Sequence, residues 1–262
     1  MTFRALELRT EVMLMDGVST FEDMGDHVIQ RTPGEPDYWE GNRLILKLAD
    51  VPAERALAEF DAAFPEAGHL AITFDVPDMP PGAQDPAFVA AGCTVERCDT
   101  LMLTDELAPA SPAEGIALRP LETDADWEQS HRLALDWARA DGYDLVQYEG
   151  FHRRRFARWR TKVDAGRGVW IGAFDGELLV GQMGIFVGNG LARYQHVQTA
   201  ATHTGRGIAS AMLVDCADRA RQIDPEATIV IVADEGSAAG RIYRRAGFSR
   251  VETLTFLNRR DV

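Results

Sequence analysis

The stretch that decides the fold is THTGRGIASAMLVDCADRARQ, residues 202–222. A long run without a helix breaker follows Gly-Arg-Gly. Its apolar residues recur at helical spacing from Ile208 to Ala220, which predicts a helix with one buried face. Glycine at such a junction costs about 0.5–1 kcal/mol of backbone entropy relative to alanine. Because a helix N-terminus exposes unpaired N–H groups and a partial positive charge, we expect an anion to approach the backbone at Gly205 and Gly207.

Other interpretations of this loop stay open on these residues alone. An ordinary tight turn between a strand and a helix also uses glycines. A dinucleotide-binding fingerprint would have a third glycine where the chain has Ser210, and its strands would alternate with helices. A P-loop needs Gly-Lys-Ser/Thr, which is absent here. The order of the surrounding elements must therefore decide.

Turn signals organise the residues before the loop. Asp175-Gly176 and Gly188-Asn189-Gly190 separate apolar or alternating runs at 169–174, 178–187 and 191–199, which predicts three antiparallel strands. The other expected elements are a strand over 115–121, a helix capped by Thr123 and Asp126, a helix over 145–162, a buried strand over 227–233, a short helix through Tyr243 and a strand over 250–257. The resulting order is β-α-α-β-β-β-α-β-α-β.

This order and two motifs resemble the GCN5-related N-acetyltransferase (GNAT) family. The family's acyl-CoA loop reads Arg/Gln-x-x-Gly-x-Gly/Ala, and residues 204–209, Thr-Gly-Arg-Gly-Ile-Ala, fit all but the first position. A second signature, Ala-x-x-x-Tyr-x-x-x-Gly-Phe, stands at residues 239–248. The resemblance covers residues 115–258.

The resemblance implies acetyl-CoA as cosubstrate and a primary amine, of a small molecule or a peptide, as acceptor. Tyr243 would be the general acid that protonates the leaving thiolate. Main-chain groups of Val197, Gln198 and Thr199 would hold the acetyl and pantetheine parts. The pyrophosphate would lie on the backbone N–H groups of Gly205, Arg206, Gly207, Ile208, Ala209 and Ser210, with Arg206 adding a mobile positive charge.

Some positions depart from the family pattern. Thr204 replaces Arg or Gln, Gly236 replaces an asparagine, and Ile231 stands where some members have a glutamate base. An amine of pKa about 10.4 is protonated at pH 7, so a base or an ordered water is needed. His196 and Glu149 are the candidates, although a locally hydrogen-bonded histidine and a solvated glutamate explain them equally well.

The run FHRRRFARWR, residues 151–160, mixes arginine with aromatic residues. We expect Phe156 and Trp159 to pack inward and the arginines to form a solvated face. An arginine rim at the mouth of the acceptor site is the alternative.

The N-terminal part resembles a second, degenerate copy. The segment that begins at Phe88 aligns with the one that begins at Tyr243, with Gly92 opposite Gly247. Upstream, residues 42–48, 52–64 and 69–74 predict a strand, a helix and a buried strand. The junction before that helix has no glycine but contains Asp50 and Glu54, which would repel phosphate. Chance similarity of short segments is the alternative.

These observations predict an α/β (α+β) fold of two GNAT-like domains, each a mixed, mostly antiparallel sheet flanked by helices. The N-terminal domain, residues 1–106, would be degenerate and lack a CoA loop. The two prolines and small residues at 107–115 predict a linker, and residues 116–262 would form the catalytic domain.

Composition limits the partners. Residues 1–114 carry 22 acidic and 7 basic residues, a net charge of −15, whereas residues 115–262 carry 19 and 20, a net charge of +1. An acidic chain argues against nucleic-acid binding. Cys93, Cys98 and Cys216 form no metal or disulfide pattern, and Cys216 falls in the apolar row. Without a signal peptide or an apolar run of about eighteen residues, we expect a cytoplasmic protein that binds no metal and no membrane.

We therefore expect an acetyl-CoA-dependent N-acetyltransferase that works by direct attack of the amine. The rival is a non-catalytic acyl-CoA-binding or sensory protein, favoured by the missing glutamate and the altered loop. A scaffold that binds no CoA is a third interpretation. The acceptor, the acyl chain length and the choice between monomer and homodimer stay open.

Overall fold

The structure is a computed structural model and describes residues 2–36, 38–142 and 144–260. The chain divides into two compact units. Unit 1 comprises Met1–Leu101, Val232–Gly240 and Arg250–Val262, and unit 2 comprises Met102–Ile231 and Arg241–Ser249. Each unit takes residues from the C-terminal segment, so neither is contiguous in sequence. The predicted division at 107–115 stays a prediction.

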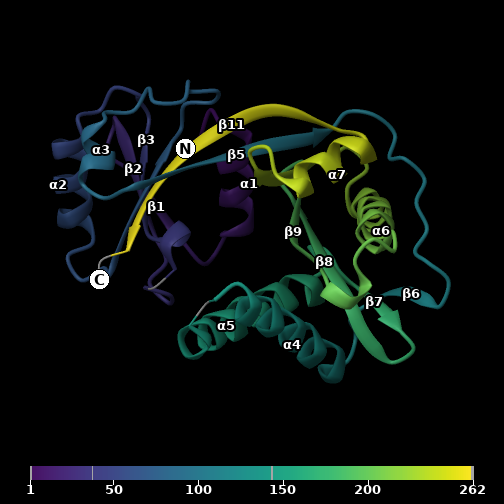
Figure 1. Cartoon of the computed structure of the whole chain (residues 1–262). Coiled ribbons are helices and arrows are strands. Elements are labelled where there is room, and N and C mark those ends of the chain that lie inside the picture. Colours follow the sequence, from purple (N-terminus) through teal and green to yellow (C-terminus); the bar gives the residue numbers. More distant parts are fainter. Residues whose placement is uncertain (1, 37, 143, 261–262) are drawn as a thin grey trace. The chain divides into compact units, whose positions relative to one another are not determined.

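Unit 1 is a mixed sheet with helices on both faces (Figure 1). Its strands are β1 (Thr20–Asp23), β2 (His27–Arg31), β3 (Arg43–Leu46), β4 (His69–Phe74), β5 (Thr94–Leu103) and β11 (Phe248–Arg260). Its helices are α1 (Leu6–Leu14), the 3-10 turn η1 (Trp39–Gly41), α2 (Ala53–Ala63) and α3 (Ala87–Ala90). The strand order is β1-β2-β3-β4-β11-β5, so the last strand of the chain lies between two strands of the N-terminal part.

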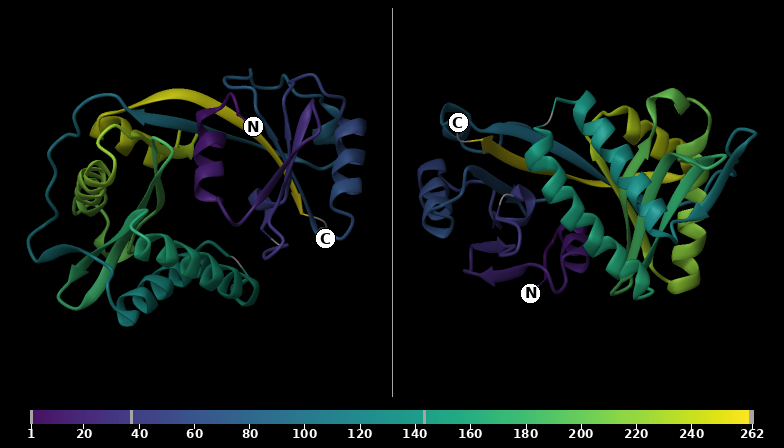
Figure 2. Two further views of the ribbon diagram at one scale, coloured as in Figure 1. Left: turned by 180° about the vertical axis from the view of Figure 1, so that it is seen from behind. Right: turned by 90° about the horizontal axis from the view of Figure 1, so that it is seen from below.

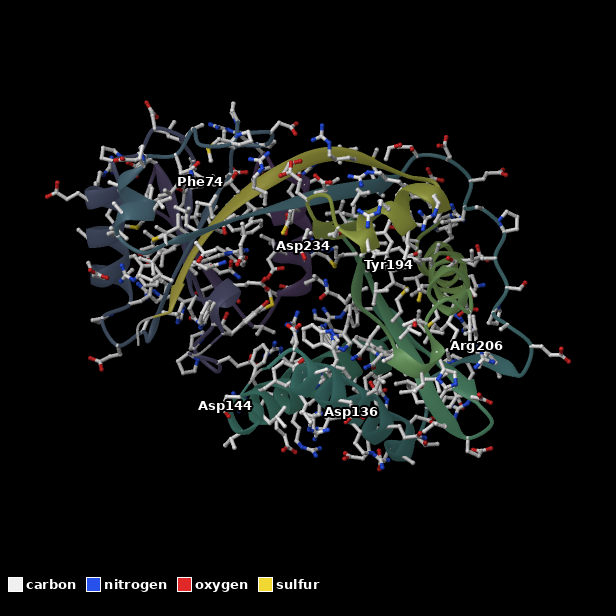
Figure 3. All side chains as sticks on the ribbon, in the orientation of Figure 1. Phe74, Asp136, Asp144, Tyr194, Arg206 and Asp234 are labelled. Carbon is white, nitrogen blue, oxygen red and sulfur yellow. The ribbon has the colours of Figure 1, made fainter. Side chains whose placement is uncertain are left out.

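The faces of this sheet follow from the alternation of side chains along a strand. In β3, Leu44 and Leu46 join the core that includes Phe60 of α2, whereas Ile45 joins the core that includes Leu8 of α1. Figure 3 labels Phe74, which is fully buried in the core on the α2 side. The continuous apolar runs in β3 and β4 therefore reflect burial on both faces.

Unit 2 holds the elements around the glycine loop. Its strands are β6 (Ile116–Pro120), β7 (Gly168–Asp175), β8 (Leu178–Gly188), β9 (Leu191–Thr199) and β10 (Thr228–Asp234). Its helices are α4 (Asp124–Ala140), α5 (Leu145–Asp164), the 3-10 turn η2 (Ala201–His203), α6 (Ile208–Ile223) and α7 (Ala238–Ala246). Elements are assigned to the unit that holds most of their residues: residues 232–234 of β10 and 238–240 of α7 belong to unit 1, and residues 102–103 of β5 and 248–249 of β11 belong to unit 2. The strand order is β10-β9-β8-β7-β6, antiparallel except for the parallel pair β9/β10.

Local chemistry explains where these elements begin and turn. Thr123 and Asp126 form the predicted capping box at the start of α4. Asn189 and Gly190 have φ angles of 53° and 72°, as a tight hairpin turn between β8 and β9 requires. The predicted strands and helices of residues 116–260 are confirmed, with boundaries shifted by a few residues.

Helices cover both faces of the unit 2 sheet. Both views in Figure 2 show α4 and α5 on one face and α6 on the other. Trp170 of β7 is fully buried on the α4/α5 face, with its ring centroid 5.1 Å from that of Phe156 and 4.7 Å from that of Trp159. Cys216 is buried on α6, as expected. The predicted inward packing of Phe156 and Trp159 is confirmed.

The same topology occurs twice. The order β1-β2-β3-α2-β4-α3-β5 repeats as β7-β8-β9-α6-β10-α7-β11. In both series the first two strand pairs are antiparallel, and the next pair, β3/β4 or β9/β10, is parallel. Gly92 and Gly247, which were aligned in the sequence, both have positive φ after the last helix of their series. The predicted fold class is confirmed.

Candidate functional site

The loop between β9 and α6 leaves a helix end uncapped. Gly205 and Gly207 have φ angles of 76° and 73°, a region that favours glycine. Gly207 is the N-cap of α6 and supplies no side-chain acceptor. Within the part of the chain that the structure describes, the backbone N–H groups of residues 205–210 donate to no protein acceptor. Such a set of donors at a helix N-terminus fits a pyrophosphate.

The segment 107–115 lies against this loop. The N–H of Ala113 donates to the carbonyl of Arg206 at 3.1 Å. A Cβ atom on Gly207 would lie 3.2 Å from the carbonyl oxygen of Ser111. Gly207 therefore has two local requirements, a positive φ and a neighbouring backbone, in addition to any ligand.

The side chain of Arg206 has protein partners. Its guanidinium lies 3.6 Å from Asp175 Oδ2 and donates to the carbonyl of Glu114 at 3.5 Å (Figure 3 labels Arg206). His203 Nε2 lies 3.2 Å from the same Asp175 oxygen. Asp175 therefore offsets part of the positive charge that the sequence places in the loop.

β9 contains a bulge that the sequence analysis missed. Gln198 pairs with Gln182 of β8, whereas Gln195 pairs with Gly184, so β9 holds one extra residue between these pairs. His196 lies in this bulge with a φ angle of 55°, which is uncommon for a residue other than glycine. Strained backbone of this kind clusters at functional sites. No local sequence signal marks it.

The residues after the bulge are those predicted to hold the acetyl and pantetheine parts. Gln198 and Thr199 pair with β8 on one side. On the other side of β9, β10 pairs only with Leu191–Arg193. The backbone of Val197, Gln198 and Thr199 on that side therefore lies outside the β9/β10 pairing.

Three histidines gather beside the bulge. His131 Nδ1 of α4 and His152 Nδ1 of α5 lie 3.0 Å apart, and the ring centroids of His152 and His196 lie 5.4 Å apart. Burial lowers the pKa of His152 to about 2 and that of His196 to about 3. Burial also lowers the pKa of His131, assisted by the charge of Arg153. The rings of His152 and His196 are therefore neutral at pH 7.

The other proposed base, Glu149 of α5, joins the same cluster. Its Oε1 lies 3.7 Å from His131 Nε2 and 3.1 Å from Arg153 Nη2. His131 and His152 were not singled out in the sequence because histidines on different helices carry no spacing signal. The structure brings Glu149 and His196 to one cluster through them.

Two of the arginines of residues 151–160, Arg153 and Arg160, lie in ion pairs. Arg153 also lies 3.1 Å from Glu128, and Arg160 lies 2.7 Å from Asp124. The Arg155 guanidinium lies 4.7 Å from the ring centroid of Trp159. This pairing agrees with the expected arginine face, which the negative side chains partly neutralise.

Tyr243 lies on α7 and is 5% exposed. Its ring packs edge-on against Phe248, with centroids 6.5 Å apart. Gly247, four residues later, has a φ angle of 116°, and a Cβ there would lie 2.9 Å from the carbonyl oxygen of Glu106. The acid role of Tyr243 stays a prediction.

Two further properties concern the described residues. Among them, no group of three or more His, Cys, Asp or Glu side chains has an arrangement that could hold a metal ion, and this includes the three histidines beside the bulge. None of their helices combines the length and apolarity needed to cross a bilayer.

Comparisons with known proteins agree on the fold. Residues 140–258 match a family profile described as "Acetyltransferase (GNAT) domain". No curated protein sequence matches the chain significantly. A conserved protein of unknown function from Staphylococcus epidermidis has a similar structure, with a TM-score of 0.71, 13% identity, and coverage of 95% of this chain and 98% of its own.

Two further solved structures carry functional descriptions. A GCN5-related N-acetyltransferase from Kribbella flavida has a TM-score of 0.62 at 17% identity, covering 95% of this chain and 93% of its own. A tandem GNAT protein from the clavulanic acid biosynthesis pathway has a TM-score of 0.54 at 17% identity, covering 94% and 84%. At these identities the likeness establishes the fold alone.

Proposed function

Because residues 140–258 match the profile of a GNAT domain, we propose that the chain is a member of the GCN5-related N-acetyltransferase superfamily and that its unit 2 transfers an acetyl group from acetyl-CoA to a primary amine. The observation that carries the proposal is the uncapped N-terminus of α6 in its two-glycine loop. An acyl-CoA pyrophosphate supplies the anion that these N–H groups lack. Acetyl-CoA itself contributes an activated thioester carbonyl.

The proposed CoA site uses mainly backbone groups. The N–H groups of Gly205, Arg206, Gly207, Ile208, Ala209 and Ser210 hold the pyrophosphate. Main-chain groups of Val197, Gln198 and Thr199 hold the acetyl and pantetheine parts. The bulge at His196 supports this assignment, because it turns peptide groups out of the regular ladder.

The proposed reaction is direct attack of the amine on the thioester carbonyl. The developing oxyanion is stabilised by a backbone N–H near Val197. Tyr243 donates its phenolic proton to the leaving thiolate, as a phenol of pKa about 10 can do when hydrogen-bonded. His196 accepts the proton of the amine. Glu149 is the second candidate for this base, but its carboxylate is engaged with Arg153.

One observation favours the rival, a protein that binds acyl-CoA without catalysis. Ile231 of β10, where some relatives have a glutamate base, is buried and cannot accept a proton. The departures at Thr204 and Gly236 point the same way. In the rival, the loop still binds CoA, whereas His196 is only a structural residue.

Calorimetry with CoA and acetyl-CoA, combined with thiol release over a panel of amines, tests the proposal. We expect one CoA per chain, because the proposal gives unit 1 no CoA loop, and thiol release that depends on the amine. CoA binding without release for any amine would favour the rival. No binding of either compound would reject both. The cytoplasmic location and the oligomeric state stay predictions.

A further inference from the structure

We propose that two buried glutamines, Gln182 and Gln198, hold His196 with its hydrogen on Nε2, so that Nδ1 is the atom that accepts the proton of the amine. The assignment of the tautomer stands on hydrogen bonds alone, and its catalytic use rests on the proposed function. Gln182 and Gln198 are then positioning residues.

The orientation of the Gln182 amide is fixed by two partners, one that can only donate a hydrogen bond and one that can only accept one. The indole N–H of Trp170 can only donate, and it lies 3.1 Å from Gln182 Oε1. The carbonyl of Ser130 can only accept, and it lies 3.0 Å from Gln182 Nε2. The hydroxyl of Ser130 also bonds to Gln182 Oε1. Gln182 is fully buried, so water does not compete for these groups.

The orientation of Gln198 follows. Its Nε2 donates to the carbonyl of Leu133 at 2.9 Å, and its Oε1 accepts from Gln182 Nε2 at 2.6 Å. The same Oε1 lies 3.2 Å from His196 Nε2. An amide oxygen can only accept, so Nε2 of His196 must carry the hydrogen. In a neutral imidazole, the other nitrogen, Nδ1, then holds a lone pair.

The surroundings keep the ring neutral. Trp159, Trp170 and Phe156 pack around it, with ring centroids 5.3–5.9 Å from that of His196. Among the described residues of unit 2, Arg155 and His152 are charged or titratable groups next to this ring. His131 and Tyr148 lie against His152, and Glu149 and Arg153 lie beside His131. Arg155 adds to the effect of burial in lowering the pKa of His196, whereas the hydrogen bond to Gln198 opposes it.

The proton inventory of the step closes. The amine is protonated at pH 7 and first releases one proton to water. As the neutral amine then forms its new C–N bond, its nitrogen becomes positive and its remaining N–H acidic. That N–H bond breaks and a new N–H bond forms at His196 Nδ1. His196 Nε2 keeps its own hydrogen and goes on donating it to Gln198 Oε1. The C–S bond breaks with its electron pair on sulfur, which takes the proton of Tyr243. Solvent then removes the proton from Nδ1 and restores that of Tyr243.

The tautomer can be measured without any substrate. The protein is labelled with ¹⁵N-histidine, and the ring nitrogens are correlated with ring protons by NMR, with His196→Asn identifying the signals of His196. We expect a protonated Nε2 and an unprotonated Nδ1 in the unaltered protein, and a mixture of tautomers in Gln198→Met. A protonated Nδ1, or a mixture in the unaltered protein, would overturn the assignment even if the enzyme is active.

The catalytic use is tested by pH profiles. Gln198→Glu puts a carboxylate on His196 Nε2, which raises the pKa of the ring, so the acid limb of kcat/KM should move to higher pH. Gln198→Met should lower kcat more than it changes KM for acetyl-CoA. The matched control is Gln129→Met. Gln129 bridges the carbonyl of Glu177 and the N–H of Leu179 without touching His196.

Gln129→Met should leave both the tautomer and the acid limb unchanged. An acid limb that stays in place in Gln198→Glu, or that moves equally in the control, would refute the positioning role. If no amine supports turnover, the proposed function fails, while the NMR result still decides the tautomer.

Discussion

The helices α6 and α2 stand at the same place in the repeated topology, yet their N-termini differ. At α6, two glycines with positive φ leave the N–H groups without a protein acceptor. At α2, the N-cap is Pro52, and the carboxylate of Asp85 accepts from the N–H of Ala53 at 3.0 Å. An internal anion thus occupies one helix end, and the other is open to an external one.

The structure also shows which acidic residue accepts from the backbone N–H groups at the start of α2. The sequence pointed to Asp50 and Glu54 as the acids at this junction, and both are exposed. The acceptor is Asp85, which lies far along the chain and also accepts from the N–H of Ala87 at 2.9 Å. These two hydrogen bonds hold the pKa of Asp85 below its usual value. The comparison shows that two helices at equivalent places in a repeated topology differ in their capacity to bind an anion. The N–H groups of α6 have no protein acceptor, whereas a carboxylate of the chain itself accepts at the start of α2.

The largest expected effect concerns the tyrosine that the N-terminal series lacks. Tyr243→Phe, which copies Phe88, should lower turnover by about 10²–10⁴-fold while CoA affinity stays nearly unchanged, because only a proton donor is lost. Tyr194→Phe is the control. This buried hydroxyl donates to the carbonyl of Leu213 at 2.6 Å, so its loss should reduce stability and spare turnover. Steady-state kinetics that give both variants equal turnover would make Tyr243 a packing residue.

The next effect concerns the open helix end itself. Gly207→Val should weaken CoA binding at least about tenfold, or about 1.4 kcal/mol, because a branched side chain enters a position of positive φ beside the loop donors. Gly190→Val is the control, since Gly190 has a φ angle of 72° and nothing within 4 Å of its added Cβ. Calorimetry should show an affinity loss only in the first variant. Equal affinities in two folded variants would remove the loop from the CoA site.

Acid should lower the stability of unit 2, because this unit contains two buried histidines whose pKa values are strongly lowered. The folded pKa values of His152 and His196, about 2 and about 3, lie below that of an unfolded imidazole, about 6.5. Their contribution to stability is therefore complete above pH 6.5 or so. It falls as the pH drops toward the folded values, because the unfolded chain binds protons that the folded chain rejects.

We expect the free energy of unfolding to fall between pH 6.5 and 5 by up to about 1.4 kcal/mol per pH unit for each histidine. Urea titrations followed by tryptophan fluorescence report mainly on unit 2, which contains Trp127, Trp137, Trp159 and Trp170, whereas unit 1 contains Trp39. His152→Phe should make the dependence on pH shallower. An identical slope in this variant would contradict the assignment.

The smallest effect concerns the occupied helix end. Asp85→Asn keeps one acceptor oxygen where two are used, so the urea midpoint should fall slightly. Asp50→Asn, an exposed acid at the same junction, should leave the midpoint unchanged. Neither variant should add a second CoA site, since the α2 junction has no glycines. Two CoA molecules per chain in calorimetry would refute the claim that only the N-terminus of α6 binds CoA.

The sequence by itself determined the local features of this protein. Turn residues, helix caps and the periods of apolar residues specified the elements of residues 116–260 and the glycine loop, because these signals act over a few neighbouring residues. The alignment of Gly92 with Gly247 indicated the repeat. By contrast, the short and largely exposed β1 carries little apolar signal, so it was not predicted.

The tertiary structure decided what depends on residues far apart in the chain. It placed β11 between β4 and β5, Asp85 at the start of α2, and His131 against His152. It also decided the bulge at His196 and the glutamines that orient its ring. Packing selects such contacts by mutual fit and burial, and no local propensity encodes which distant partner a strand, a cap or an imidazole meets.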